Sequence, residues 1–223
     1  VADRWFRPTT GFDDAIVAGL DQIAAGSTLR AGRLRAPLGV RYVVIPEFDG
    51  IVSTVDDPLE TPLGLTDAFA EQLDIVSRFT IPTVEFYENS SWLPTASELS
   101  GATAEASEAT GAGAQVRAGQ SARVPAFVGV TSTSVVTEEI PAGTVHLAVP
   151  FDRGWTLTVD GVDVAPRRAF GTTLAFDVET GGLATLQYEP AASRGWWVAA
   201  QVGLWLLVVF GAIRVTVSFG QRR

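Results

Sequence analysis

The stretch FDRGWTLTVDGVDVAP, Phe151 to Pro166, decides the fold that this sequence predicts. Residues 156–159 alternate polar and apolar side chains, which is the pattern of a strand with one buried face. Asp160-Gly161 is a dipeptide that tolerates the positive φ angles of a tight hairpin turn, and residues 162–166 return as a second strand. We therefore expect an antiparallel β-hairpin at this position.

The segments around the hairpin extend it into a larger antiparallel meander. Strand-like runs cover residues 123–130, 131–137 and 144–150, and Gly181-Gly182 turns the chain into a final run that ends near Pro190. Apolar and polar side chains alternate along residues 173–178. This pattern predicts an α+β, mostly β fold: an antiparallel β-sandwich-like domain over residues 123–193, with a few short helices elsewhere.

The first part of the chain, residues 1–94, predicts an α/β subdomain. Apolar residues recur on one face of a helix from Ile16 to Ala24, and Asp13 and Asp14 suit its first turn. We expect a buried strand over residues 38–48, a short helix over residues 67–73, and a hairpin that pairs residues 73–79 with 83–88.

Residues 95–122 differ from both neighbouring parts in composition. They consist mainly of Ala, Ser, Thr, Gly and Glu, with almost no large apolar side chain. A segment of this composition can bury little apolar surface, and this burial does not offset the conformational entropy that the segment would lose on folding. We therefore expect a mobile linker here, and a frayed helix around residues 104–110 is the one ordered element that we consider.

An 18-residue apolar run, Trp196 to Ile213, follows the β-rich region. As a helix it would span about 27 Å, close to the roughly 30 Å of a bilayer core, so we expect a transmembrane helix over residues 194–214. Aromatic residues belong at one membrane interface and arginines on the cytoplasmic side, which predicts a cytoplasmic tail over residues 215–223 and residues 1–195 outside the cell membrane. The expected interface residues are Trp196, Trp197, Arg214, Arg222 and Arg223.

Composition excludes several classes of function. The 223 residues carry a net charge of −9, which argues against a nucleic-acid partner. The chain has no Cys and a single histidine, His146, so we predict no metal site and no cofactor. It also begins at Val1 and contains no Met, and we expect it to be the C-terminal piece of a longer protein.

No residue set predicts catalysis, but five residues are candidates for binding a substrate. The paired acids Asp56-Asp57 and Glu138-Glu139 would serve acid–base chemistry only if the fold opposed them. Aromatic rings at strand ends or turns can stack on sugar faces, and nearby Asn and Asp side chains can bind hydroxyl groups. The candidates are Tyr87, Asn89, Trp92, Trp155 and Asp160. The alternative is that Trp155 packs in the core and Trp92 packs beside Pro94.

An ordered set of short motifs resembles a known family. Gly154-Trp155, Val159-Asp160-Gly161, Phe170-Gly171 and residues 186–190 precede the apolar run, and residues 38–44, Tyr87-Glu88-Asn89 and Leu93-Pro94 come before them in the same order. This order is similar to the C-terminal region of YfhO-like, multi-pass bacterial glycosyltransferase-type membrane proteins. The resemblance covers residues 38–94 and 141–213.

The resemblance implies an extracytoplasmic, non-catalytic module at the end of a polytopic protein that acts in cell-envelope glycan or lipid glycosylation. Its implied partners are the lipid bilayer, a glycan or polyprenyl-linked sugar, and the upstream transmembrane portion of the same protein. One alternative is a structural or partner-binding ectodomain of an envelope complex. Another is an independent hydrolase, which would need two carboxylates across an open cleft.

Overall fold

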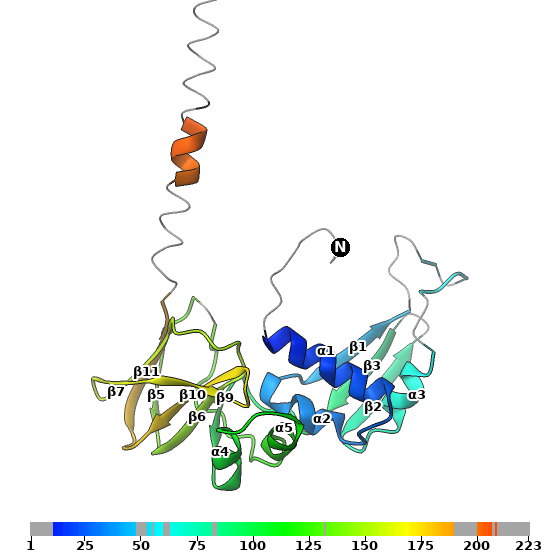
Figure 1. The fold of residues 1–223 in the computed structure, drawn as a ribbon, viewed down its shortest axis with the longest axis horizontal. Helices are drawn as coiled ribbons and strands as arrows, with labels where there is room; N and C mark the ends of the chain where they lie inside the picture. Colours follow the sequence, from blue (N-terminus) through cyan, green and yellow to red (C-terminus); the bar gives the residue numbers. More distant parts are fainter. Residues whose placement is uncertain are drawn as a thin grey trace, which may run out of the picture. The chain divides into compact units, whose positions relative to one another are not determined.

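The computed structural model describes residues 11–47, 53–54, 56–59, 63–81, 84–131, 133–189, 200–206 and 208. The chain divides into two compact units, residues 1–187 and residues 188–223, and each is described by itself. In the first unit the described residues form antiparallel β-sheets with a few short helices, which confirms the predicted mixture (Figure 1).

The first sheet is antiparallel, with three strands in the order β1-β3-β2. Its strands are β1 (Tyr42–Pro46), β2 (Ile75–Ile81) and β3 (Val84–Asn89). The pairing of β2 with β3 confirms the hairpin expected from the sequence. The expected burial of residues 38–48 is wrong in part: β1 is an edge strand with only Ile45 fully buried, because helices cover one face of this sheet only.

Three helices and one 3₁₀ turn accompany this sheet. They are α1 (Gly11–Ala24), α2 (Ala31–Arg35), η2 (Ala36–Leu38) and α3 (Leu65–Ala70). Helix α1 lies where its apolar periodicity predicts, and Ile23 from its buried face is fully enclosed. Ile23 packs with Phe69 of α3 and Tyr87 of β3, so the core of this part lies between the helices and the sheet that Figure 1 labels.

Helix α2 is held at its N-terminus by side chains from the segment before β2. The N–H of Ala31 donates to Gln72 Oε1 (2.9 Å). The N–H groups of Gly32 and Arg33 donate to the two carboxylate oxygens of Asp74, at 2.9 and 2.8 Å. These are the donors that a helix leaves unpaired in its first turn, so the contacts stabilise a helix of five residues that would not persist alone.

Residues 95–122 form ordered elements, so the prediction of a mobile linker is wrong; the helix considered around residues 104–110 agrees in part with one of these elements. The elements are β4 (Ala96–Leu99), α4 (Ala102–Ala106) and α5 (Ala112–Ala118). Alanine favours helices, and its small side chain lets helices approach closely. Ala106, Ala114 and Ala118 are buried in one cluster with Leu93 and Phe170, so larger residues from neighbouring segments supply the apolar surface that this stretch lacks.

The remaining strands form two four-stranded antiparallel sheets, with orders β4-β6-β10-β9 and β5-β11-β7-β8. The strands are β5 (Val136–Ile140), β6 (Gly143–Leu147), β7 (Trp155–Val159), β8 (Val162–Val164), β9 (Pro166–Ala169), β10 (Thr173–Val178) and β11 (Gly182–Tyr188). The predicted hairpin is confirmed by the pairing of β7 with β8, and Asp160 and Gly161 have positive φ angles of 47° and 82°. The strand expected over residues 123–130 is reduced to one bridge between Pro125 and Ser97.

The chain passes from one of these sheets to the other at Ala165, between β8 and β9. Strand β10 lies inside its sheet, and both of its faces are buried except at Asp177. The sequence predicts one buried face, but Thr173 and Ala175 on the second face are fully enclosed as well. Ala175 belongs to the cluster that includes alanines of α4 and α5, so these helices cover that face. Strands β7 and β9 contact each other, an arrangement compatible with a sandwich of the two sheets.

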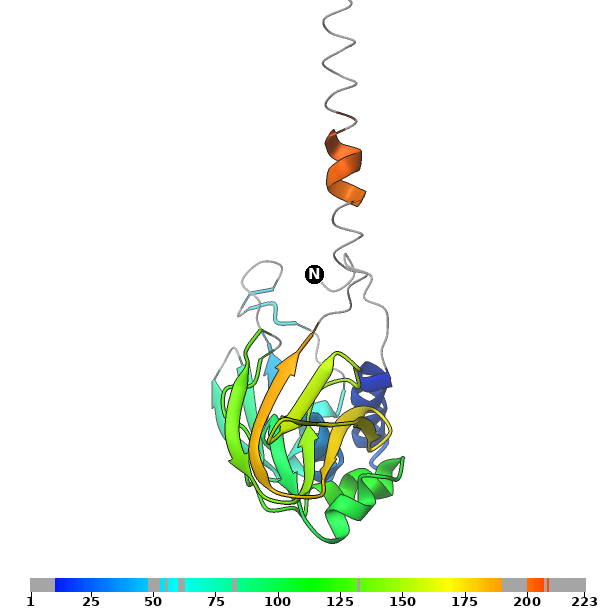
Figure 2. The same cartoon turned by 90° about the vertical axis from the view of Figure 1, so that its left-hand side faces the viewer.

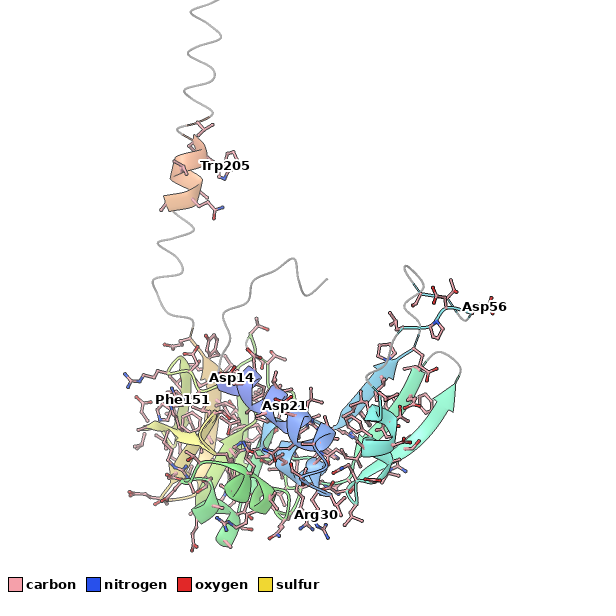
Figure 3. All side chains as sticks on the ribbon, turned by 45° about the vertical axis from the view of Figure 1, so that its right-hand side comes forward. Asp14, Asp21, Arg30, Asp56, Phe151 and Trp205 are labelled. Atoms are coloured by element: carbon pink, nitrogen blue, oxygen red, sulfur yellow. The ribbon has the colours of Figure 1, made fainter. Side chains whose placement is uncertain are left out.

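In the second unit, residues 200–206 are helical, and Trp205 projects from this segment with 63% of its surface exposed (Figure 3). Among the residues that the structure describes, no helix has the length and apolar character needed to cross a membrane. The transmembrane helix expected over residues 194–214 lies mostly outside the described residues. The expected interface residues Trp196, Trp197, Arg214, Arg222 and Arg223 lie outside them entirely.

The close contact at the start of α2 generates a prediction about stability. A Cβ atom at Gly32 would lie 2.3 Å from Asn89 Oδ1 and 2.8 Å from the backbone oxygen of Asp74. We expect Gly32→Ala to lower the free energy of unfolding by about 1–3 kcal/mol, because the cap must move to make room. Chemical denaturation measures the change.

The control is Gly113→Ala in α5, where an added Cβ meets no atom within 4 Å. Alanine has the higher helix propensity, so this variant should equal the original chain or exceed it by up to about 1 kcal/mol. Equal effects of the two substitutions would contradict the assigned role of the α2 cap.

Candidate functional site

The five candidate binding residues lie in two separate parts of the first unit. Tyr87 and Asn89 are in β3, and Trp92 follows three residues later. Trp155 and Asp160 lie at opposite ends of β7, in another sheet. The structure therefore brings Asn89 and Trp92 into one region and leaves Trp155 and Asp160 apart from them.

Tyr87 and Asn89 make contacts inside the fold. Tyr87 is 4% exposed, its ring lies 5.4 Å from that of Phe69, and its hydroxyl donates to Glu85 Oε2 (2.7 Å). Burial and the neighbouring carboxylate raise the pKa of Tyr87 well above its usual value, so its hydroxyl stays protonated. Asn89 donates its side-chain amide to the backbone oxygens of Gly32 and Val40. Both side chains hold β3 against neighbouring elements.

Trp155 is enclosed, whereas Asp160 lies at the surface. Trp155 is 6% exposed at the start of β7, which agrees with the alternative that it packs in the core. Asp160 occupies the exposed turn before β8, and its Oδ1 accepts a hydrogen bond from the backbone N–H of Leu183 (2.9 Å). This bond ties the hairpin to β11.

A pocket of about 660 Å³ lies beside this hairpin. Its lining includes four acidic residues, Asp160, Asp163, Asp177 and Glu179. Asp163 accepts from Thr158 Oγ1, and Asp177 accepts from Thr144 and from Arg167. Hydrogen bonding to Arg167 comes first among the causes that lower the pKa of Asp177. Three of the four carboxylates are therefore engaged within the fold.

A cluster of arginines and a tryptophan lies at one end of the three-stranded sheet. We call it the arginine–tryptophan cluster; its members are Arg41, Arg78, Glu88, Trp92 and Arg123. The Arg41 guanidinium carbon is 4.5 Å from the centre of the Trp92 ring and 4.8 Å from that of Tyr42, so this cation lies against two aromatic rings. Arg123 approaches the same Trp92 ring at 5.9 Å.

The cluster has an excess of positive charge, since three arginines face one glutamate. Arg78 Nε lies 2.6 Å from Glu88 Oε2, and Arg41 Nε lies 3.4 Å from Glu88 Oε1. The hydrogen bond from Arg78 leads the causes that hold the pKa of Glu88 below its usual range. The indole N–H of Trp92 is enclosed and makes no hydrogen bond in the described part of the chain. Guanidinium groups ordered in this way can bind carboxylate or phosphate groups.

Sequence reasoning identified Trp92 but missed the arginines of this cluster. Arg41 precedes β1, Arg78 lies in β2 and Arg123 follows α5, so only the folded chain brings them together. Arg41 lies next to Tyr42 at the start of an alternating strand. That pairing of a cation with an aromatic residue at a strand end was the local signal available.

His146 is part of a buried chain of polar side chains. It is fully enclosed, with Nε2 3.0 Å from Thr173 Oγ1 and Nδ1 3.4 Å from Ser97 Oγ. The hydroxyl of Thr173 donates to the backbone oxygen of Ala169, so Nε2 of the imidazole donates to Thr173. Burial, assisted by the positive charge of Arg167, lowers the pKa of His146 to about 3. The imidazole is therefore neutral at physiological pH.

Comparisons with known proteins add no assignment to this geometry. No protein-family model, curated protein or solved structure matches the chain. Among the residues that the structure describes, no group of three or more His, Asp or Glu side chains is arranged to hold a metal ion. The arginine–tryptophan cluster is therefore the candidate functional site in the described part of the chain.

The turn contact of Asp160 predicts different effects for two substitutions. Asp160→Asn keeps a side-chain oxygen for Leu183 and tolerates the positive φ angle, so stability should change by less than about 0.5 kcal/mol. Asp160→Ala loses both properties and should lower the free energy of unfolding by about 1–2 kcal/mol. Thermal and chemical denaturation distinguish the two, and equal stability of both variants would show that the contact with Leu183 contributes nothing.

The buried imidazole predicts a pH dependence of stability. The pKa of His146 is lowered from 6.5 to about 3 on folding, so the unfolded chain binds a proton in this interval that the folded chain does not. Above pH 6.5 the imidazole is neutral in both states, so His146 does not lower the free energy of unfolding there. The free energy of unfolding decreases as the pH falls from 6.5 toward about 3, by up to about 1.4 kcal/mol per pH unit, because the unfolded chain binds the proton.

The matched variant is His146→Gln, which retains a donor and an acceptor but does not titrate. Its free energy of unfolding should depend less on pH than that of the original chain between pH 7 and pH 5 (a range set by the usual histidine pKa of ~6.5). Glu88 and Asp177 are present in both proteins, so their acid titration cancels in the difference. Parallel pH profiles would contradict a buried neutral His146.

Proposed function

We propose that the chain forms the extracytoplasmic, non-catalytic module and last transmembrane helix of a polytopic, glycosyltransferase-type membrane protein. The module acts in cell-envelope glycosylation by positioning an acceptor glycan or a lipid-linked sugar. The sandwich-like arrangement of the two four-stranded sheets and the apolar run Trp196–Ile213 support this proposal, together with the resemblance of the ordered motifs.

The observation that carries the positioning role is the arginine–tryptophan cluster. Arg41 is stacked against Trp92 and Tyr42, and the enclosed indole N–H of Trp92 has no hydrogen-bond partner among the residues that the structure describes. Stacked aromatic and guanidinium planes offer flat contact surfaces, and the surplus of positive charge favours an anionic group. The cluster therefore favours a glycan that carries phosphate or carboxylate over a neutral one.

Binding of the full chain to an array of neutral and anionic glycans tests the proposal. We expect binding to phosphate- or uronate-bearing glycans, and a loss of about tenfold or more in affinity with Trp92→Ala and with Arg41→Gln, which corresponds to about 1.4 kcal/mol. Arg153→Gln changes an exposed arginine between β6 and β7, in the other part of the unit, and is the matched control.

Circular dichroism of each variant shows whether it is folded. Unchanged binding in Trp92→Ala would refute the cluster as the binding site. A folded chain that binds no glycan would favour the alternative of a structural or partner-binding ectodomain.

A further inference from the structure

The three-stranded sheet has one face that helices cover and one that no described helix covers. We call the second the outer face; apolar side chains exposed on it are Tyr42, Val44, Pro46, Val76 and Phe79. Between 42% and 51% of the surface of Tyr42, Val44, Val76 and Phe79 is exposed. Phe86, which is partly buried, lies between Tyr42 and Phe79, with ring centres 5.1 and 4.8 Å away.

The strand register arranges these side chains in rows across the sheet. Tyr42, Glu88 and Val76 form one row, and Val44, Phe86 and Phe79 form the next. Pro46 and Val84 continue toward the carboxyl end of β1. The outer face is therefore charged at the end where Arg41 and Glu88 lie, and apolar toward Pro46.

A contiguous apolar surface of this kind on a folded unit is typical of an interaction site. A soluble acidic partner would be repelled, because residues 1–195 carry 13 arginines and 25 acidic residues. The surface that covers the outer face must therefore bind chiefly through apolar contact. Aromatic residues with arginines beside them are typical of the membrane–water interface, where the rings and the lipid phosphates are both within reach.

The position of the outer face in the unit also points to the membrane. In Figures 1 and 2 the carboxyl ends of β1 and β11 lie at the same end of the first unit. The apolar run Trp196–Ile213 begins nine residues after Gln187, the last residue of that unit. Nine residues span at most about 32 Å. The inference rests on the proposed function, in which the apolar run lies in the bilayer, so this end of the unit remains close to the bilayer.

We propose that the outer face docks on the surface of the bilayer in which the chain is anchored. Val44, Pro46 and Phe79 enter the interfacial region. The tether keeps the local concentration of lipid high, so weak contacts are sufficient for docking. Docking fixes the height of the arginine–tryptophan cluster above the membrane.

The absence of cysteine from the chain makes single-site labelling a direct test. The full chain is reconstituted in vesicles of phosphatidylcholine, which carry no net charge. A polarity-sensitive, membrane-impermeant thiol fluorophore is attached to Val44→Cys or to the control Val162→Cys, which is 68% exposed in β8. We expect a blue-shifted emission and several-fold weaker iodide quenching at Val44→Cys than at Val162→Cys, with little dependence on salt.

Phe79→Ser in the Val44→Cys background should restore quenching toward the value of the control. Equal quenching at both labelled sites, in vesicles that retain the chain after alkaline extraction, would overturn the docking inference and leave the proposed function standing. Extraction of the chain by alkali would remove the tether and overturn both. Protection at Val44→Cys that persists in detergent and disappears on dilution of the protein would show self-association instead, and would also overturn the inference.

Discussion

The hydrogen bonds between Asp74 and the first turn of α2 connect the two parts of the folded unit. Asp74 lies directly before β2, and the helix that it caps packs against α5 as well as α1. Helix α5 in turn contributes Ala114 and Ala118 to the core that covers the β4-β6-β10-β9 sheet. A five-residue helix depends on such external partners, so the loss of this cap would separate the three-stranded sheet from the helices beside it.

The same junction explains the positions of the arginines in the candidate site. Asn89 binds Gly32 and Val40, which fixes the end of β3 against the chain entering β1. Arg41 follows Val40 directly, and Trp92 follows Asn89 after a short turn, so their stacking depends on the preceding contact. The buried side-chain amide of Asn89 thus determines the geometry of the arginine–tryptophan cluster at the surface.

Local patterns in the sequence predicted the elements whose determinants are local. The Asp160-Gly161 turn specifies the β7–β8 hairpin, and the apolar spacing of residues 16–24 specifies α1. The elements β4 and α5 were missed, and α4 was anticipated only as a frayed helix, because alanine-rich segments gain their burial from distant partners such as Phe170 and no local pattern shows those partners. For the site, Trp92 was predictable as an aromatic residue near a turn. Arg123 and Arg78 reach it only through the tertiary fold.

The strand β4 has a consequence for how this chain folds during synthesis. It comes from the middle of the sequence, yet it pairs with β6, from Ala96 opposite Leu147 to Leu99 opposite Thr144. The sheet that it joins also needs β10, which leaves the ribosome later still. Pairings so distant in the chain slow folding, because the loop between them must close first. The edge of β4 therefore stays unpaired through much of translation, and the nascent chain is most open to wrong strand pairing in that interval.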